Sequence, residues 1–332
     1  MQKVRAEIDL GAIRANARRF AALAGGAALC AVVKADAYGH GAAMVAHALR
    51  GVARSFAVAL VEEGVALRQA GVSEDILVLV PPLCEEEVLR GCAYGLTFSL
   101  SDASDAALIG AVCERFGLTA RCHIKVNTGM NRFGFDGEAL DSFLCRPRAR
   151  LRVEGIASHF YRPEDAATAE AQYRLFREYC ARAEAAFGPL QKHIAATGGV
   201  LASSRYSADM VRVGIGLYGY VPNGFASPRL RRAMRVYATV ASVRRYAGGG
   251  MGYGARRPNG ENLFVLRCGY ADGLFRAGTL CMDACVAEGR AEKYGEVCIL
   301  SDADAAAAAN GTIAYEVLAR IGGRAVRDYV DR

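Results

Sequence analysis

The sequence predicts an α/β protein: an eight-stranded (β/α)8 TIM-like barrel followed by a small, mainly β C-terminal domain. Three observations support this prediction. Short β-branched runs alternate with longer helical patterns between about residues 27 and 216, and this alternation stops after Tyr220. The chain has 332 residues, more than the ~250 that are typical of one such barrel. Eight repeated βα units close into a barrel more naturally than they form an open sheet.

Eight apolar runs of strand length can be counted in the first two thirds of the chain. Each is short and rich in β-branched residues, as expected of buried parallel strands. They cover residues 29–33, 56–60, 76–80, 96–100, 120–126, 151–158, 192–196 and 210–213. Intervening segments such as 42–50, 62–70 and 166–185 have the length and composition of helices.

A different pattern begins after the barrel. Residues 221–228 are rich in Pro, Gly, Ser and Asn and predict a linker. The apolar runs beyond it lack intervening amphipathic helices, so residues 221–332 are expected to form a β domain. Those runs are 236–243, 263–268, 280–286 and 297–300. The barrel is then expected over residues 11–220, with residues 1–10 joining the β domain as an N-terminal strand.

Composition narrows the choice of partners and location. The net charge is +7, but the cations are scattered. The densest group falls near the expected linker, which argues against a nucleic-acid partner; it comprises Arg229, Arg231, Arg232 and Arg235. The apolar run 20–33 has 14 residues, too few for the ~20 that span a bilayer. The charged start does not resemble a secretory signal, so we expect a cytoplasmic protein with no membrane partner.

The eleven cysteines are better explained as buried thiols than as disulfides. Several lie in apolar, strand-like runs such as 28–32 and 296–300, where a reduced thiol behaves as a small hydrophobic side chain. No pair has the spacing of metal ligands. We therefore expect no metal.

Polar residues occur where several of the predicted strands end. They are Lys34, Lys125, His159, Thr197 and Arg212. Reactive groups of such barrels project from these strand ends. A lysine that enters a partly desolvated pocket loses proton affinity and can attack an aldehyde to form an imine. An isolated lysine at a strand end, however, is more often a surface residue that extends its amine into water.

Glycines follow the seventh and eighth predicted strands. They occur in the segments 197–199 (Thr-Gly-Gly) and 213–216 (Val-Gly-Ile-Gly). Backbone N–H groups in such turns can hold a phosphate, as in barrels that bind it after strands seven and eight. Taken alone, glycines of this kind more often only form turns.

Residues 31–41, Ala-Val-Val-Lys-Ala-Asp-Ala-Tyr-Gly-His-Gly, closely resemble the cofactor-lysine segment of the alanine racemase family. Seven further blocks match in the same order: 6–10, 123–134, 211–219, 252–254, 269–273, 281–283 and 315–316. The resemblance implies an eight-stranded barrel followed by a β domain. It also implies a pyridoxal 5'-phosphate (PLP) enzyme that interconverts L- and D-alanine and supplies D-alanine for peptidoglycan. The enzyme would be a homodimer whose active sites are shared between subunits.

The resemblance implies four catalytic residues. Lys34 would hold PLP as a Schiff base and act as one base, and Tyr253 of the other subunit would act on the opposite face of the substrate. Arg212 would face the pyridine nitrogen and, because it keeps its proton, favour return of a proton to Cα over transamination. His159 would link Arg212 to the tyrosine.

The resemblance also implies binding residues. Arg132 would bind the substrate carboxylate, and Lys125 matches a lysine that is carbamylated in some family members. Cofactor contacts besides Lys34 and Arg212 would be Tyr38, Thr197, Gly214, Ile215 and Tyr315. Three residues of the second subunit would lie near the substrate: Tyr270, Met282 and Asp283.

Three features depart from the family pattern. Ala196-Thr197 stands where the family has Asn-Ser, so the hydroxyl is kept and the amide is lost. Only nine residues separate Asp272 from Met282, fewer than the family usually has, which removes a strand or loop near the mouth of the site. Residues 160–165 also differ, so that Tyr161 or Arg162 could reach toward substrate.

Three other functions compete with alanine racemisation. A racemase of another small amino acid, such as serine, is the nearest, but a tyrosine at position 315 keeps the pocket small and favours alanine. A PLP decarboxylase or D-amino-acid lyase would usually have a carboxylate in place of Arg212. A non-enzymatic PLP-binding homeostasis protein would resemble the barrel alone and leave the C-terminal blocks unexplained.

Overall fold

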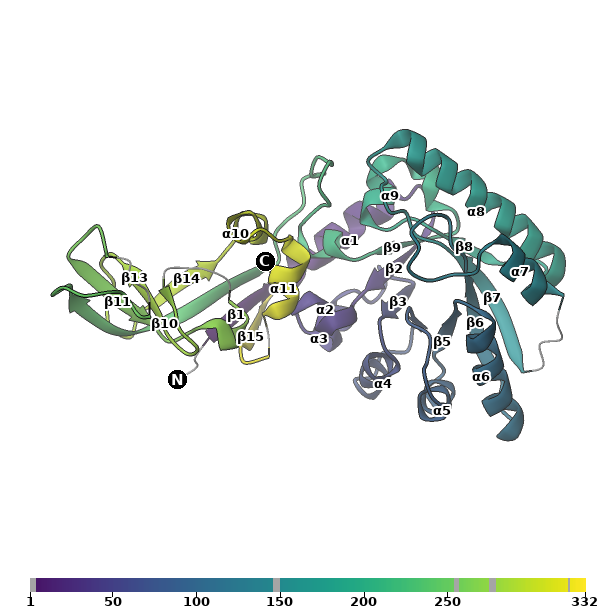
Figure 1. The fold of residues 1–332 in the computed structure, drawn as a ribbon, viewed down its shortest axis with the longest axis horizontal. Coiled ribbons are helices and arrows are strands. Elements are labelled where there is room, and N and C mark those ends of the chain that lie inside the picture. The colour runs from purple at the N-terminus through teal and green to yellow at the C-terminus, as the bar shows by residue number, and fades with distance from the viewer. Residues whose placement is uncertain (1–3, 146–149, 254–256, 275–278, 322) are drawn as a thin grey trace.

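The computed structural model describes residues 4–145, 150–253, 257–274, 279–321 and 323–332. Two sheets organise this part of the chain, one with eight strands and one with seven. They lie one after the other along the long axis of the molecule, with the eight-stranded sheet and its helices at the right of Figure 1. The fold is therefore a barrel followed by a mainly β unit, and the predicted fold class is confirmed.

The eight-stranded sheet is parallel and almost closed. Its order is β8-β7-β6-β5-β4-β3-β2-β9, and a bridge between Ala196 and Arg212 joins the two ends. Asp209 N also donates to Lys192 O (3.0 Å) across this junction. The strands are β2 Ala28–Val32, β3 Ser55–Val58, β4 Asp75–Val78, β5 Thr97–Leu100, β6 Ala120–Lys125, β7 Leu151–Ala157, β8 Gln191–His193 and β9 Met210–Val213. All eight predicted strands are confirmed, with ends that differ by at most three residues.

Helices surround these strands (Figure 1). They are α1 Leu10–Leu23, α2 Lys34–Tyr38, α3 Ala42–Ala48, α4 Val61–Gln69, α5 Glu85–Ala93, α6 Ala103–Arg115, α7 Gly137–Leu144, α8 Ala166–Phe187 and α9 Thr197–Ala202. Short 3-10 turns η1 Ser204–Ser207 and η2 Ile215–Tyr218 flank β9. Acidic residues cap two of the longer helices: Asp102 accepts from Ser104 N (2.8 Å) and Asp165 from Thr168 N (2.8 Å).

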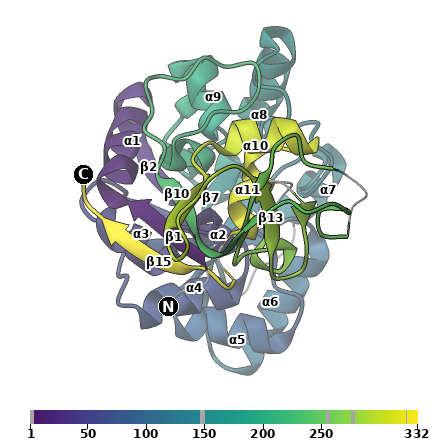
Figure 2. The ribbon, with the colours of Figure 1, turned by 90° about the vertical axis from the view of Figure 1, so that its left-hand side faces the viewer.

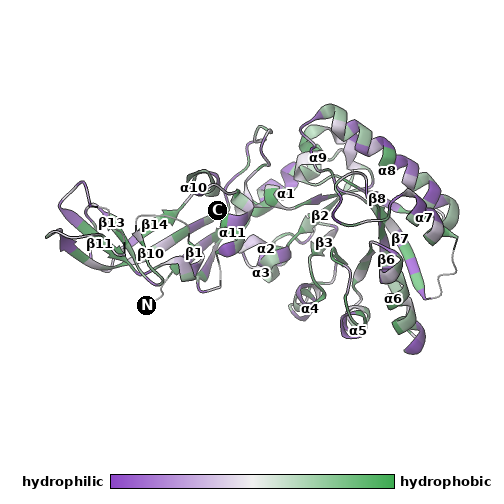
Figure 3. Cartoon of the chain, in the orientation of Figure 1, coloured by the Kyte–Doolittle hydropathy of each residue, from purple (hydrophilic) through white to green (hydrophobic). Residues whose placement is uncertain are grey.

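The barrel strands are buried on both faces. Every residue of β3, β5 and β9 is buried, as expected where helices cover a parallel sheet. Figure 3 shows apolar residues along the barrel strands and hydrophilic residues on parts of α6, α7 and α8. The core therefore lies in and around the barrel wall, and polar groups inside it are exceptions that need an explanation.

The second sheet is mixed. It contains β1 Val4–Asp9, β10 Met234–Arg245, β11 Asn262–Leu266, β12 Thr279–Leu280, β13 Cys285–Glu288, β14 Glu296–Leu300 and β15 Val326–Val330. The first strand, β1, pairs antiparallel with β10 and parallel with β15. The first and last strands of the chain are thus neighbours in this sheet.

Two details of this region were wrong in the sequence prediction. The run 280–286 is a tight hairpin, because Cys281 N donates to Ala284 O (2.7 Å) and Leu280 pairs with Cys285. Two helices that were not expected are present, α10 Ala303–Asn310 and α11 Ala314–Arg320. They are short, and α10 consists largely of alanine, so neither carries a clear amphipathic pattern.

The helix α11 connects the second sheet to the mouth of the barrel. A Cβ on Gly39 would lie 2.4 Å from Ile321 O and 2.5 Å from Leu318 O, so only glycine permits this approach. In a view along the long axis, α11 and α2 lie near the centre, in front of the barrel (Figure 2). The arginines near the linker are engaged within the fold: Arg231 pairs with Asp9 (3.0 Å) and Arg232 with Asp302.

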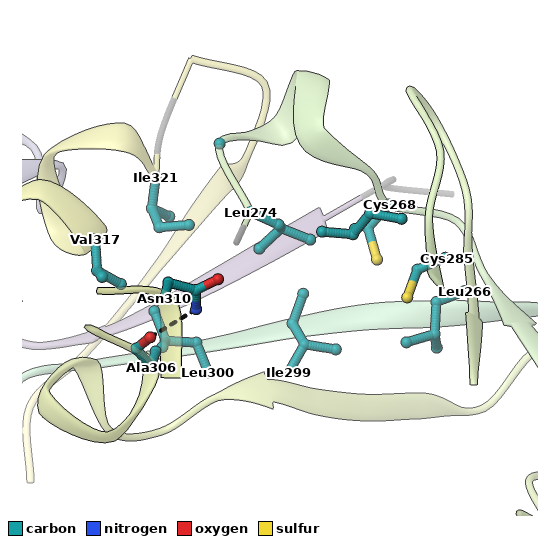
Figure 4. A pocket seen from close by; sticks show the side chains of 12 residues that line it. Leu266, Cys268, Leu274, Cys285, Ile299, Leu300, Ala306, Asn310, Val317 and Ile321 are labelled. Atoms are coloured by element: carbon teal, nitrogen blue, oxygen red, sulfur yellow. Dashed lines mark hydrogen bonds between the residues drawn. The ribbon is translucent and has the colours of Figure 1, made fainter. Parts of the chain in front are cut away.

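An apolar cavity of about 50 Å³ lies between the second sheet and its two helices (Figure 4). Leu274, Ile299 and Val317 line it, with Cys268 and Cys285 at one side. Among the described residues that line the cavity, none is charged. No helix in the described ranges is long and apolar enough to cross a membrane.

Candidate active site

The chain leaves β2 through an unusual turn that begins at Lys34. Ala35, Asp36, Ala37 and Tyr38 all have left-handed backbone angles, with φ between 50° and 55°. Such a conformation costs roughly 1–2 kcal/mol per non-glycine residue and normally occurs at single positions. A run of four persists only where surrounding contacts stabilise it, which is typical of functional sites.

Hydrogen bonds from three parts of the fold hold this turn. Ala35 N donates to Glu63 Oε1 (2.6 Å), and Ala42 N donates to Asp36 Oδ1 (2.7 Å). Asp36 also pairs with Arg327 of β15. His40 is buried and donates from Nδ1 to Ala37 O and Tyr38 O, both at 2.9 Å. The backbone that carries Lys34 is therefore fixed.

The Lys34 side chain is half-buried among cations. Burial, followed by the charge of Arg132, lowers the pKa of Lys34 below its ordinary value, while Glu63 raises it. A lower pKa leaves more of the amine uncharged and nucleophilic near neutral pH. Lys34 is thus suited to attack a carbonyl group.

Further basic side chains gather beside Lys34 at the carboxyl ends of the strands. Burial, with Arg212 and Arg132 next, lowers the pKa of Lys125 well below its usual range. Burial also lowers the pKa of His159, and the charges of Arg212, Lys125, Arg132 and Lys34 add to this effect. A small cavity is lined by Lys125, Arg132 and His159. This concentration of positive charge favours an anionic ligand.

Arg212 is buried and is held by several acceptors. Its NH1 group donates to His193 Nδ1 (2.6 Å) and His193 O (3.0 Å). Its NH2 group donates to Ser158 O (2.7 Å) and His159 Nδ1 (3.2 Å). Burial lowers the pKa of Arg212 to about 10, so the guanidinium remains charged at neutral pH.

A second histidine extends this network into the barrel. His193 lies 2.8 Å from His123, from Nε2 to Nδ1. Because Arg212 only donates, His193 must accept at Nδ1 and, when neutral, donate from Nε2 to His123. A Cβ on Gly155 would lie 2.7 Å from the His123 ring, so glycine makes room for it. The sequence analysis missed His193 and His123; a histidine inside an apolar strand was the available signal.

Residues expected to contact phosphate lie together. Gly216 N donates to Thr197 Oγ1 (3.3 Å), which joins η2 to the start of α9. A Cβ on Gly214 would lie 2.6 Å from Tyr38 Oη, and the Tyr38 and Tyr315 ring centroids are 6.1 Å apart. The first N–H groups of η2, beginning at Ile215, have no partner inside the helix. Hydroxyl and N–H donors around glycines form a cradle that suits phosphate.

The other predicted residues form a second group, on the β domain. Gly252 precedes Tyr253, and a Cβ on it would lie 3.3 Å from Cys281 Sγ. Cys281 O accepts from Tyr270 N (3.1 Å), and Met282 follows directly. The side chains of Tyr253, Tyr270 and Met282 are 92%, 55% and 55% exposed.

The remaining predicted residue of this group, Asp283, pairs with Arg324 at 2.8 Å. Within the described ranges, no hydrogen bond, ion pair or ring contact joins this group to Lys34 or its neighbours. Tyr253 lies in the loop before β11, and Met282 and Asp283 lie just before β13; β11 and β13 are at the end of the molecule away from the barrel (Figure 1). In one chain, the predicted site residues therefore fall into two separate groups.

The loop after His159 lies near the cation cluster. The Tyr161 ring would be 3.4 Å from a Cβ on Gly129, and the Tyr161 side chain is exposed. Buried Gln172 accepts from Tyr161 N (3.1 Å) and donates to Thr128 Oγ1 (3.1 Å). Arg162 instead lies near Glu164 (3.5 Å). The sequence analysis did not identify Gln172.

The described residues contain no group of three or more His, Cys, Asp or Glu side chains that could hold a metal ion. None of the eleven cysteines forms a disulfide. Burial raises the pKa of several thiols, including Cys30 and Cys285 to about 11. These thiols are therefore protonated and unreactive at neutral pH.

The fold is that of a barrel enzyme, with a half-buried lysine at the carboxyl end of a strand and hydroxyl and N–H donors around glycines at the ends of other strands. Comparison with known proteins gives the family. The family model "Alanine racemase, N-terminal domain" matches residues 8–222. An alanine racemase of Beutenbergia cavernae is 36% identical over 375 aligned positions, which cover 98% of this chain and 97% of the relative.

Solved structures agree along the whole chain. Alanine racemase from a D-cycloserine-producing Streptomyces lavendulae has a TM-score of 0.90 and 32% identity, with 100% of this chain and 98% of that one covered. Alanine racemase from Bartonella henselae, described with covalently bound pyridoxal phosphate, has a TM-score of 0.87 and 26% identity, with 99% and 100% covered. This chain belongs to the alanine racemase family, and it is an isomerase of the amino-acid racemase class.

Proposed function

We propose that the protein interconverts L- and D-alanine with PLP bound through Lys34. The observation that carries this proposal is the half-buried Lys34 amine, which lies on a fixed turn with the cradle of Tyr38, Thr197 and Gly214 nearby. The covalently bound pyridoxal phosphate of the Bartonella henselae relative supports the same assignment. When bound, PLP supplies an electron sink that makes the Cα proton of an amino acid acidic.

Two properties of the chain fit this cofactor. The cradle offers glycine, hydroxyl and N–H groups to a phosphate, and a side chain at position 214 would collide with Tyr38. The lowered pKa of Lys34 supplies an amine that can bond to the cofactor aldehyde. Together these residues provide for both ends of PLP.

Racemisation needs a proton donor and acceptor on each face of Cα. We assign Lys34 to one face and Tyr253 of a second chain to the other. Within one chain, Tyr253 lies with the exposed group on the β domain, away from Lys34. A homodimer that shares its sites would bring Tyr253, Tyr270 and Met282 against the barrel of the partner and cover their exposed apolar surface.

The other assigned residues orient the substrate and the ring. Arg132 supplies a bidentate guanidinium for the substrate carboxylate. A carbamate on Lys125, an amine whose pKa burial lowers well below its usual range, would place a negative charge beside Arg132. Arg212 would hold the pyridine end of the cofactor as a donor that keeps its proton, which would favour return of a proton to Cα. The Tyr315 ring near Tyr38 narrows the pocket and favours alanine over serine.

The proposal is tested by exchange in deuterated water. The purified protein is supplied with PLP and incubated with L-alanine and, separately, with L-serine. We expect deuterium at Cα and formation of the D-enantiomer, both faster with alanine. Borohydride reduction should leave the cofactor on the peptide that contains Lys34. No deuterium at Cα of either amino acid would contradict the proposal.

The two-base assignment has a directional test. Tyr253→Phe is expected to abolish exchange that starts from L-alanine and to keep part of the exchange that starts from D-alanine, because only one proton carrier is removed. Equal loss in both directions would contradict the assignment of one face to each base. A cytoplasmic location and a role in supplying D-alanine for peptidoglycan remain predictions from the sequence and its resemblance.

A further inference from the structure

The turn that follows Lys34 depends on a carboxylate from a different βα unit. Glu63 lies in the first turn of α4, and its Oε2 accepts from Ala59 N (2.6 Å) and Leu60 N (3.1 Å). Its Oε1 accepts from Ala35 N (2.6 Å), next to Lys34. One carboxylate therefore connects the end of β2 with the end of β3.

Glu63 makes a hydrogen bond that a helix cap does not require, and that bond reaches outside α4. In a capping box, the third helical residue accepts an N–H from its own N-cap residue, and Oε2 of Glu63 does this at Leu60. The other oxygen leaves the helix and meets Ala35, the first left-handed residue of the turn. Because the donor is a backbone N–H and the acceptor is charged, this bond is of the stronger, charge-assisted kind.

Electrostatics agree with the geometry. Burial and Arg132 lower the pKa of Lys34, and Glu63 is the group that raises it. The carboxylate therefore holds the backbone beside the lysine and also limits how far the amine is pushed toward its neutral form.

We propose that Glu63 is a positioning residue for Lys34: its carboxylate holds the left-handed turn and so fixes the backbone from which the reactive lysine emerges. The chemistry that Lys34 then performs rests on the proposed function. The hydrogen bond between Glu63 and the turn does not depend on that function, so the role of Glu63 and the proposed function can be tested separately.

The test compares Glu63→Gln with Glu62→Gln. The amide of glutamine keeps one acceptor but has no charge, and its NH2 group would face a backbone N–H. Glu62 is the matched control, since it precedes Glu63 on α4 and lies at the surface, 3.7 Å from Arg90. Both changes remove one negative charge from the same helix turn.

The first measurement is hydrogen exchange of the full-length protein, read by mass spectrometry in the peptide that spans residues 34–41. We expect exchange to be about 10-fold faster in Glu63→Gln, because a charge-assisted hydrogen bond is lost. Glu62→Gln should match the unchanged protein. Thermal unfolding shows whether each variant is folded.

The second measurement is the pH dependence of reductive methylation at Lys34, in protein from which any cofactor has been released with hydroxylamine and removed by dialysis. The midpoint should fall by about half a pH unit in Glu63→Gln, because the group that raises the Lys34 pKa is gone. Glu62→Gln should leave it unchanged. A folded Glu63→Gln protein with normal exchange at 34–41 and a normal Lys34 midpoint would overturn the proposal, whether or not the protein racemises alanine.

A third variant covers the case in which Glu63→Gln folds poorly. Ala35→Gly removes a Cβ from a left-handed position, where glycine is tolerated. If Glu63 acts by holding this turn, the double variant Glu63→Gln/Ala35→Gly should be more stable to heat than Glu63→Gln. It should also exchange more slowly than Glu63→Gln at residues 34–41. If Glu63 only caps α4, Ala35→Gly will restore neither, and the proposal is wrong.

Discussion

At the scale of single residues, the site consists of basic side chains whose charge is controlled by burial. Arg212 keeps its charge and fixes the hydrogen-bonding roles of His193 and His159. Burial lowers the pKa of His123 and His40 to about 4, so these histidines are neutral at pH 7. Neutral histidines act here as directional donors and acceptors that support the charged groups.

Stability should therefore fall in mild acid. His40 is buried and its pKa is about 4 in the folded protein, below the ordinary value of about 6.5. The unfolded chain binds its proton at higher pH, so the stabilisation is complete above pH 6.5 and is lost as the pH falls toward 4. Between pH 7 and 5 the free energy of unfolding should drop by about 2 kcal/mol through His40 alone.

Urea unfolding of the unchanged protein and of His40→Gln at both pH values checks this prediction. The variant should be less stable at pH 7, because it loses the bonds to Ala37 and Tyr38, but its stability should depend less on pH. Equal pH dependence of the two proteins would show that His40 is not buried in its neutral form.

Residue identities in the site were predictable only in part. Lys34, Arg212 and His159 could be proposed because each lies at or just after the end of a predicted strand, in a barrel whose reactive end is known from its topology. Glu63 and Gln172 could not, because they act through backbone N–H groups and loops far away in sequence. Only the three-dimensional contact shows which helix residue reaches which loop.

At the scale of elements, close approaches define the cradle. Gly216 lies in η2, and a Cβ there would be 2.4 Å from the Phe20 ring and 3.0 Å from Thr197 Cγ2. Phe20 belongs to α1 and is fully buried. The cradle is thus packed between α1 and the start of α9, and position 216 has no room for a side chain.

Gly216→Ala should disturb both stability and cofactor binding. Overpacking of this kind costs about 1–3 kcal/mol, and displacement of Thr197 should weaken PLP binding. Gly260→Ala is the control, because a Cβ there meets nothing within 4 Å. Urea unfolding and PLP titration measure the two effects. If Gly216→Ala left both the free energy of unfolding and the affinity for PLP unchanged, η2 would be able to shift freely and the cradle would not be rigid.

Sequence patterns predicted the barrel strands well and the unusual elements poorly. Buried parallel strands are short, continuous apolar runs, which their length and their β-branched residues reveal. The left-handed turn after Lys34 is not detectable in this way, because alanine and tyrosine have no preference for that conformation. The hairpin of β12 and β13 was missed because its turn, residues 281–284, contains neither Gly nor Pro and only Asp283 interrupts the apolar residues. The helix α11 was missed because it spans only two turns.

At the scale of the whole molecule, the residues proposed for the site fall into two groups in one chain, and within the described ranges no hydrogen bond, ion pair or ring contact joins them. The barrel provides Lys34, Arg132 and Arg212, while the β domain exposes Tyr253 and Met282. Aromatic and apolar side chains exposed together are typical of an interaction surface. A closed symmetric dimer would place each exposed group against the barrel of its partner, and this is the central claim of the proposed mechanism.

Complementation between two inactive variants tests this claim most directly. Lys34→Ala and Tyr253→Phe are expressed together, and racemisation of L-alanine is measured. If each site takes Lys34 from one chain and Tyr253 from the other, mixed dimers contain one intact site, and random pairing should restore about a quarter of the original activity. Activity no greater than that of the two variants measured separately would contradict the shared site.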